Sequence, residues 1–160
     1  MANDPDSLGF FAAVALDNMA RRQPHKTAVV SKDEELTFAE LNRRVHALAA
    51  HLQKEDVRQG DRVGILLPNS TAIPLSYFAT QKIGAVTVIL DARLKGKELQ
   101  AVLKDADLKL LIVHAQLFGE IEEAFKAMPS IPLWVVGGQG ERSFEERFCA
   151  PADAISSPRL

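Results

Sequence analysis

Residues 36–91 read LTFAELNRRVHALAAHLQKEDVRQGDRVGILLPNSTAIPLSYFATQKIGAVTVILD, and this stretch decides the fold. A helical pattern, a Gly turn and a pattern typical of a buried strand follow one another twice within it. Alternation of this kind builds a parallel sheet with helices packed on its faces. We therefore expect the rest of the chain to extend or cover this unit.

The first helical pattern begins after Thr37. Thr37 and Glu40 have the spacing of a capping box, in which each side chain satisfies a backbone N–H left free at the start of the helix. The following apolar residues are spaced by four, three and four positions: Leu41, Val45, Leu48 and Leu52. This stripe predicts an amphipathic helix whose apolar face covers the sheet.

Two apolar runs, residues 63–67 and 85–90, are predicted to be strands of the sheet. Residues 63–67 are unbroken rather than alternating, which is typical of a strand that is buried on both faces. Residues 85–90 are rich in β-branched side chains and are predicted to be a second buried strand. Between them lies a second helix, and we expect Asn69, Ser70 or Thr71 to cap its first turn.

The same alternation continues toward both ends of the chain. A helix over residues 7–22 and a short hairpin come first; strands at 110–113 and 133–136 follow, with helices over about 99–106 and 116–127 between the strands. The predicted fold class is α/β: a Rossmann-like, mostly parallel sheet with helices on both faces, plus a small N-terminal hairpin. Residues 1–148 are expected to form this unit, and residues 149–160, rich in Pro, Ser and Ala, to form a linker.

Composition excludes several classes of function. The formal net charge is -2 and no basic block is present, so neither nucleic acid nor an anionic membrane surface is an expected partner. The N-terminal residues are polar and acidic, unlike a signal peptide, and no apolar run approaches the length of a membrane span. Cys149 is the single cysteine, which fits a reducing compartment, and we expect a cytoplasmic protein.

Several motifs in order resemble the start of the adenylate-forming (AMP-forming) acyl-CoA synthetases, the AMP-dependent synthetase and ligase family. They are LTFAEL at 36–41, GDRV at 60–63, PNS at 68–70, YFA at 77–79 and KIGAV at 82–86. The resemblance covers roughly residues 8–148. One departure is Lys95-Gly96, where the family usually opens a helix with Thr-Pro, so we expect a weaker cap and a frayed first turn there.

The resemblance implies an N-terminal subdomain of an enzyme that converts a carboxylate, ATP and CoA into acyl-CoA, AMP and pyrophosphate. ATP, Mg²⁺ and CoA are implied for the complete enzyme, and a fatty acid is one candidate substrate. The family's phosphate loop, its later nucleotide motifs and its C-terminal Lys have no counterpart in this sequence. We therefore assign no catalytic residue and no cofactor to the chain, and we predict that it does not adenylate a carboxylate alone. Surface left uncovered by missing downstream subdomains would favour self-association.

Ligands of open parallel sheets bind outside the carboxyl ends of the strands, where loops and helix N-termini converge. This rule selects Asn69, Ser70, Asp91, Arg93 and His114 as candidate ligand-binding residues. Each also has a purely structural explanation. Asn69 and Ser70 can serve as helix caps, Asp91 as a turn residue paired with Arg93, and His114 as a strand-end residue with a backbone partner.

The glycines at 137–140 follow a predicted strand, but they lack the GxGxxG spacing and the long helix that together hold a pyrophosphate. We interpret them as a plain turn. No Ser-His-Asp arrangement, HExxH motif or Cys/His cluster is visible, so the sequence predicts no hydrolytic centre and no metal site.

Two alternatives to the acyl-CoA synthetase interpretation stay open. Within the same family, the chain can be part of a peptide-synthetase adenylation domain, which a carrier-protein domain further along the gene would favour. In a different class, it can be a free-standing, non-catalytic module that binds a nucleotide, CoA or a protein partner, for which saturable binding would be the distinguishing property.

Overall fold

The computed structural model describes residues 7–32, 34–125 and 131–149. The elements follow one another as α1 (Ser7–Arg22), β1 (Thr27–Val30), β2 (Glu35–Thr37), α2 (Phe38–Lys54), β3 (Arg62–Leu66), α3 (Ala72–Lys82), β4 (Val86–Ile89), α4 (Gly96–Ala106), β5 (Leu110–His114), the 3-10 turn η1 (Ala115–Leu117), α5 (Phe118–Phe125), β6 (Leu133–Val136), the 3-10 turn η2 (Gly140–Arg142) and α6 (Glu146–Cys149). The predicted linker after residue 149 and the end of the helix predicted over 116–127 lie outside the described residues.

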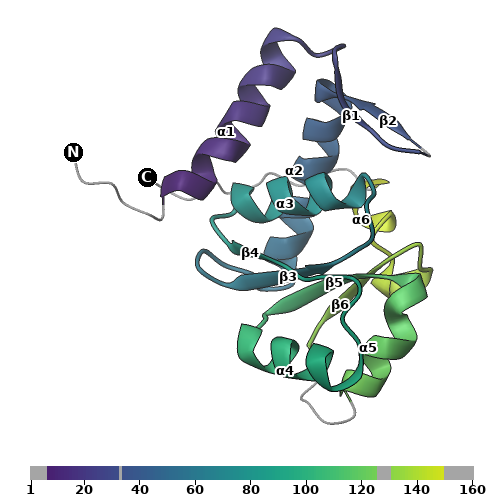
Figure 1. The fold of residues 1–160 in the computed structure, drawn as a ribbon. Coiled ribbons are helices and arrows are strands. Elements are labelled where there is room, and N and C mark those ends of the chain that lie inside the picture. Colours follow the sequence, from purple (N-terminus) through teal and green to yellow (C-terminus); the bar gives the residue numbers. More distant parts are fainter. Residues whose placement is uncertain (1–6, 33, 126–130, 150–160) are drawn as a thin grey trace.

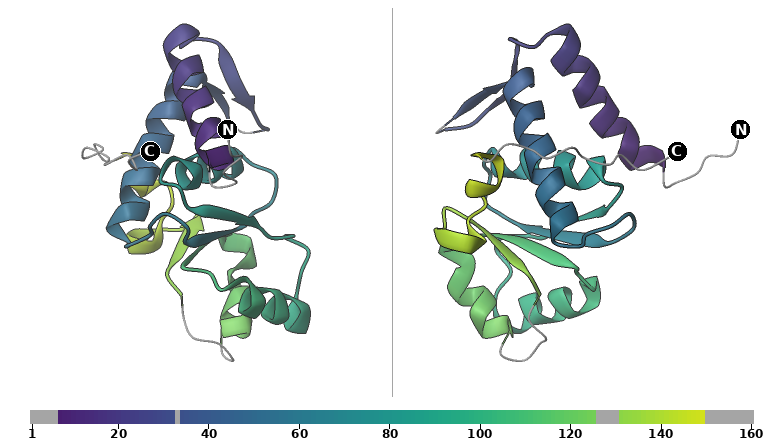
Figure 2. Two further views of the ribbon diagram at one scale, coloured as in Figure 1. Left: turned by 90° about the vertical axis from the view of Figure 1, so that its left-hand side faces the viewer. Right: turned by 180° about the vertical axis from the view of Figure 1, so that it is seen from behind.

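Four parallel strands form the main sheet in the order β4-β3-β5-β6. Helices α2 and α3 lie on one side of this sheet, and α4 and α5 lie on the other (Figures 1 and 2). A separate two-stranded antiparallel hairpin, β1-β2, precedes α2. The predicted class is therefore confirmed: a Rossmann-like parallel sheet covered on both faces, with a small N-terminal hairpin.

The sheet separates two hydrophobic cores. In β5, the side chains of Leu110 and Ile112 join the core under α1, α2 and α3, whereas Leu111 and Val113 join the core under α4 and α5. All four are fully buried. Successive strand residues point to opposite faces, so an uninterrupted apolar run is what a strand inside such a sheet requires.

Gly64 lies in the middle of β3, where the core under α4 leaves no room for a side chain. A Cβ added there would lie 2.5 Å from Cδ1 of Leu108 and 2.8 Å from Cδ1 of Leu111. Both leucines are buried, so neither side chain can move into solvent. Glycine at this position lets the second core close against the sheet.

The predicted capping box begins α2. The Glu40 amide donates to Thr37 Oγ1 at 3.3 Å, and the Thr37 amide donates to Glu40 Oε2 at 2.9 Å. The hydrogen bond from the Thr37 backbone is the main cause that holds the pKa of Glu40 below its usual value. Lys95 is the N-cap residue of α4 and makes no side-chain cap hydrogen bond, as the Lys95-Gly96 sequence predicted.

Strand β4 is not buried, which corrects the prediction for residues 85–90. It lies at the edge of the sheet, and Val86 and Ile89 are 47% and 64% exposed. The apolar run is a correct signal for a strand but carries no information about its place in the sheet.

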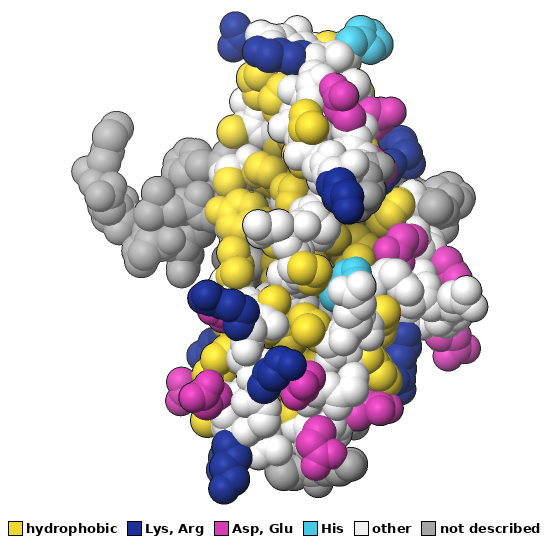
Figure 3. Space-filling view, turned by 45° about the vertical axis from the view of Figure 1, so that its right-hand side comes forward, with side chains coloured by type: hydrophobic (Ala, Val, Ile, Leu, Met, Phe, Trp, Pro, Cys, Tyr) yellow, Lys and Arg dark blue, Asp and Glu magenta, His cyan; other side chains and the backbone are white. Residues whose placement is uncertain are grey.

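Hydrophobic side chains also gather over one face of the molecule (Figure 3). No helix in the described part of the chain is long and apolar enough to cross a bilayer.

Helix α1 is held to α3 by an ion pair as well as by apolar contacts. Nζ of Lys82 lies 2.8 Å from both carboxylate oxygens of Asp17, and Nε2 of His46 on α2 lies 3.2 Å from Oδ1 of the same group. The Lys82 side chain is only 9% exposed, whereas that of Asp17 is 33% exposed. These contacts join three helices at one carboxylate.

Candidate functional site

The order in which strands are added to the sheet reverses between β3 and β5. After β3 the chain adds β4 on one side, and it then returns to add β5 on the other side of β3. In open parallel sheets, ligands bind outside the carboxyl ends of the strands at such a switch point. Ser70 follows β3, His114 ends β5, and Gly137 follows β6. These positions mark the end of the sheet at which a site is expected.

A cavity of about 300 Å³ lies at this end, beyond β3 and β6. We call it the strand-end cavity; its walls come from the hairpin, α2, the start of α3, and the segment after β6. The lining residues are Glu34, Arg44, Ser70, Thr71, Ala72, Leu75, Val136, Phe144, Glu145 and Phe148. Ser70 is the one predicted candidate residue among them.

One wall of the strand-end cavity is polar. NH1 of Arg44 lies 2.6 Å from Glu34 Oε1, and the Thr71 hydroxyl donates to Glu34 Oε2 at 2.9 Å. Thr71 occupies the N-cap position of α3, but its side chain makes no cap hydrogen bond. Of the three predicted caps, Thr71 makes no cap hydrogen bond and the Ser70 hydroxyl has no partner among the described residues. For Thr71 the reason is Glu34, which binds its hydroxyl instead.

The opposite wall is apolar. Phe144 is buried and meets Phe148 edge to face, with ring centroids 5.8 Å apart. The Arg44 guanidinium lies over the Phe148 ring at 5.0 Å, in the geometry of a cation–π contact. Leu75 and Val136 complete this wall from α3 and β6.

Two donors at the cavity are buried without a partner among the described residues. They are Oγ of Ser70 and Nε of Arg44, and each exposes less than 1 Å² to solvent. A buried donor without an acceptor carries an unfavourable desolvation free energy. Both atoms belong to residues that line the strand-end cavity, but neither atom has surface that a water-sized group in the cavity could reach.

Asp91 and Arg93 lie in the exposed turn after β4 and bind each other. Asp91 accepts hydrogen bonds from the Arg93 guanidinium at 2.6 to 3.1 Å and from the Arg93 amide at 2.9 Å. The side-chain hydrogen bond from Arg93 is the main cause that lowers the pKa of Asp91 to about 2. The pairing proposed from sequence is present, and neither residue lines the strand-end cavity.

The remaining strand-end candidates lie outside the cavity. His114 Nδ1 accepts from the Gln116 amide at 3.2 Å and so caps η1. The Gly137 amide donates to Glu145 Oε1 at 2.8 Å, which closes the glycine segment as a turn. Asn69 is exposed and does not line the cavity.

Sequence reasoning missed most of the residues that form the strand-end cavity. Glu34, Arg44 and Glu145 come from the hairpin, from α2 and from the segment after β6, far apart in the chain. No spacing rule joins such residues. The Glu34 to Arg44 ion pair, ten residues apart across the hairpin and α2, exists only once the fold has formed.

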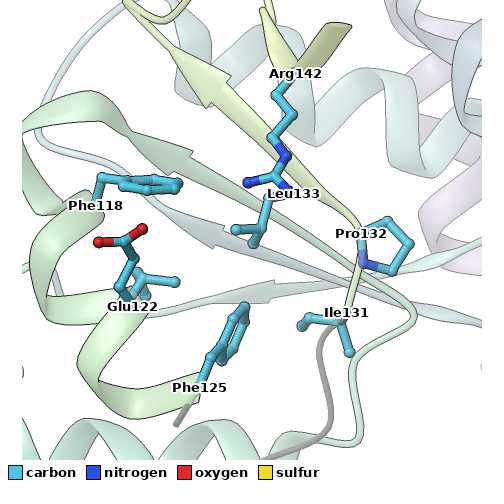
Figure 4. Close-up of a pocket in the computed structure, with 8 residues that line it drawn as sticks. Phe118, Glu122, Phe125, Ile131, Pro132, Leu133 and Arg142 are labelled. Carbon is cyan, nitrogen blue, oxygen red and sulfur yellow. The ribbon is translucent and has the colours of Figure 1, made fainter.

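A larger hollow of about 760 Å³ lies beside α5 and the start of β6. Figure 4 shows Phe118, Glu122 and Phe125 from α5 facing Leu133 and Arg142 across it. It is bordered by the amino end of β6 rather than by its carboxyl end, so the switch-point rule does not select it. Among residues 7–32, 34–125 and 131–149, no group of His, Cys, Asp and Glu is arranged to hold a metal ion.

Comparison with known proteins places this geometry in a family. The AMP-binding enzyme model matches residues 16–153. Feruloyl-CoA synthase of an Amycolatopsis species is 46% identical over 130 residues, which cover 71% of this chain and 26% of the synthase. A linear gramicidin synthase of Brevibacillus parabrevis is 32% identical over 152 residues, covering 95% of this chain and 2% of that protein.

A solved structure agrees in fold. A long-chain-fatty-acid-CoA ligase from Archaeoglobus fulgidus superposes with a TM-score of 0.84 at 23% identity, covering 92% of this chain and 31% of the ligase. The chain spans about a quarter of the length of feruloyl-CoA synthase. Because the family model extends over most of the sequence, the chain belongs to the AMP-binding enzyme family.

Proposed function

We propose that the chain is the N-terminal α/β subdomain, residues 1–148, of an AMP-forming acyl-CoA ligase. The complete protein would convert a carboxylic acid, ATP and CoA into acyl-CoA, AMP and pyrophosphate, with Mg²⁺ accompanying ATP. The observation that carries the proposal is the 46% identity with feruloyl-CoA synthase over 71% of the chain. Aromatic and fatty acids are both candidate substrates, and the lone cysteine fits a cytoplasmic location.

Within this ligase the chain would be a scaffold. A triphosphate needs several cations and N–H donors that are free to face it. At the strand ends, Arg44 is already paired with Glu34, and Arg93 with Asp91. The described residues therefore do not fit an ATP site on their own, and the chemistry would come from the subdomains that pack against this one.

A chimeric enzyme tests the proposal. Residues 1–148 would replace the matching N-terminal segment of the Amycolatopsis feruloyl-CoA synthase, and ferulate-dependent ATP–pyrophosphate exchange would be measured. We expect exchange from the chimera and none from the 160-residue chain or from the synthase without its N-terminal segment. Exchange catalysed by the 160-residue chain would refute the scaffold role, and a folded but inactive chimera would count against membership of a ligase of this type.

A peptide-synthetase adenylation domain is the second candidate. The 32% identity with the linear gramicidin synthase extends over 95% of the chain, further along it than the match to feruloyl-CoA synthase. The equivalent chimera with an adenylation domain of that gramicidin synthase distinguishes the two. Amino-acid-dependent exchange by this second chimera, with an inactive first chimera, would select the peptide-synthetase assignment.

A free-standing binding module is the third candidate. Calorimetric titration of the 160-residue chain with ATP, AMP and CoA addresses it directly. Saturable binding of any of the three, with both chimeras inactive, would favour this module over the enzyme fragments.

A further inference from the structure

We infer that the outer edge of strand β4 pairs with the same edge of a second copy of this chain, so that the main sheets of the two copies become one continuous sheet. This goes beyond the ligase assignment, since it concerns how the chain associates and which residues meet. The backbone groups at this edge, the exposed side chains of β4 and the register allowed by two-fold symmetry all point to a second copy.

The fold covers one edge of the main sheet and leaves the other open. At the β6 edge, the Phe144 amide donates to the Val135 carbonyl oxygen at 3.1 Å, and Ser143 forms a parallel bridge with Val135. No strand in the described part of the chain lies beyond β4 at the opposite edge (Figure 1). Strand β4 also contains no proline and no charged residue, which are the usual means of blocking an edge.

The backbone of β4 presents free hydrogen-bonding groups on this side. The amides of Val86 and Leu90 donate toward β3, to carbonyl oxygens at 2.8 and 2.9 Å. Because the backbone groups of successive strand residues point to opposite sides, the N–H and C=O of Thr87 and Ile89 point away from β3. Each of these two residues therefore offers one donor and one acceptor to another strand.

The side chains of β4 favour a second copy as that partner. Val86 is 47% exposed and Ile89 is 64% exposed, so apolar surface accompanies the free backbone groups. Residues 85–90 carry no charge, and Asp91 beyond them is already paired with Arg93. Two copies of this strand therefore meet without the repulsion that like charges on facing strands would cause.

Two-fold symmetry fixes the register. A closed pair of identical chains places the same residues on both sides of the axis, so the two β4 strands run antiparallel. The register that uses both outward-facing residues sets Thr87 of each copy opposite Ile89 of the other, with Val88 opposite itself at the axis. Val86 then faces Leu90 of the second copy. Both exposed apolar side chains of β4 are partly covered in this arrangement.

Engineered disulfides test this register. Val88→Cys and Ile89→Cys would each be made together with Cys149→Ser, which removes the single native thiol. Opposite residues of a non-hydrogen-bonded pair have Cα atoms about 4.5 Å apart, which a disulfide can bridge. The two copies of residue 89 would be diagonal neighbours, about 7–8 Å apart, which is too far.

With oxidised glutathione as the oxidant, we expect the Val88→Cys chain to form a disulfide-linked dimer on a non-reducing gel. The Ile89→Cys chain should form at least about fivefold less, although Ile89 is exposed and Val88 only half-buried. Random collisions would favour the more exposed thiol. Equal or greater cross-linking through the Ile89→Cys thiol would overturn the inference.

Sedimentation equilibrium of the 160-residue chain tests the association itself. Thr87→Pro removes an outward-facing N–H without removing a hydrogen bond to β3, and it should raise the dissociation constant of the dimer at least about tenfold. Thr87→Val is the matched control, because it also loses the hydroxyl that accepts from Gln81 Nε2 but keeps the amide. It should leave the dimer intact.

A wild-type chain that is monomeric at about 1 mM, or equal dimerisation of the Thr87→Pro and Thr87→Val chains, would refute pairing through β4. If Thr87→Pro does not fold, the cysteine variants decide the question. None of these measurements depends on catalysis, so failure of the β4 pairing is distinguishable from failure of the ligase assignment.

Discussion

Substitution of Asp17 by Ala should destabilise the fold far more than an exposed aspartate normally would. Asp17 is a third exposed, yet it is the carboxylate that balances Lys82, whose side chain is 9% exposed. Removing it leaves a nearly buried ammonium group without a counter-charge. Breaking a fully buried ion pair in this way costs about 3–5 kcal/mol. Because water reaches one side of Asp17, we expect about 2 kcal/mol for Asp17→Ala.

A double-mutant cycle of Asp17 and Lys82 measures the coupling free energy between the two side chains. Lys82→Met keeps most of the side-chain volume and leaves Asp17 in contact with water and His46, so we expect a loss of about 1 kcal/mol. In the double variant neither charge remains, and the loss should again be about 1 kcal/mol. The two single losses add to about 3 kcal/mol, so the coupling free energy is expected to be about 2 kcal/mol.

Urea unfolding at pH 7, followed by fluorescence of the single, buried Trp134, measures these free energies. Asp105→Ala serves as the control, because Asp105 is exposed on α4 and is not expected to change stability by more than about 0.5 kcal/mol. A loss for Asp17→Ala no larger than that of the control, or additive losses in the double variant, would refute the argument from the buried ammonium.

The same ion pair sets a pH dependence. Burial alone would raise the pKa of Asp17, but the hydrogen bond and charge of Lys82, together with His46, lower it below its ordinary value of 3.8. A carboxylate with a lowered folded pKa contributes stability above the unfolded value and loses it as the pH falls through the folded value. The difference between wild type and Asp17→Ala should therefore shrink as the pH falls below about 4. A difference that persists unchanged at about pH 2.5 would contradict this origin.

Three further substitutions test other parts of the fold. Gly64→Ala should lower the free energy of unfolding in urea by about 1–3 kcal/mol, because the added methyl group overpacks the core. Gly119→Ala should raise it by about 0.5–1 kcal/mol, because its new methyl group meets no atom within 4 Å. Equal effects of the two substitutions would refute the packing argument. Lys95→Ser supplies the missing cap of α4 and should raise stability by about 0.5–1 kcal/mol, seen as a higher Tm; an unchanged Tm would show that this turn gains nothing from a cap. Ile89→Lys should reduce self-association in sedimentation at high concentration more than Val30→Lys on the hairpin does, and a wild-type chain that stays monomeric would refute the role of the β4 edge.

Local sequence signals predicted the elements because their causes are local. The spacing of Leu41, Val45, Leu48 and Leu52 predicts α2, since residues three and four positions apart share one face of a helix. The spacing of Thr37 and Glu40 predicts the start of α2, since each side chain binds the backbone of the other residue. Where a structure depends on neighbours four residues away or fewer, the sequence contains its cause.

The errors have a common physical origin in contacts that are distant along the chain. Strand order placed residues 86–89 at the sheet edge, and no property of that run distinguishes an edge strand from a central one. Thr71 could not be known to lack a cap bond, because Glu34, 37 residues earlier, binds its hydroxyl. The strand-end cavity escaped prediction for the same reason, since it is formed by the hairpin, α2 and the segment after β6.

The polar side chains at the strand ends already have hydrogen-bond partners within the chain, and this distinguishes a scaffold from a catalytic centre. Asp91 binds Arg93, His114 binds the Gln116 amide, and Glu145 binds the Gly137 amide, so these groups already have the partners that a nucleotide would have to replace. A phosphate that displaced them would gain few contacts that the fold does not already make. The 160-residue chain should therefore not bind ATP saturably, and saturable heat in a calorimetric titration of this chain with ATP would reverse the conclusion.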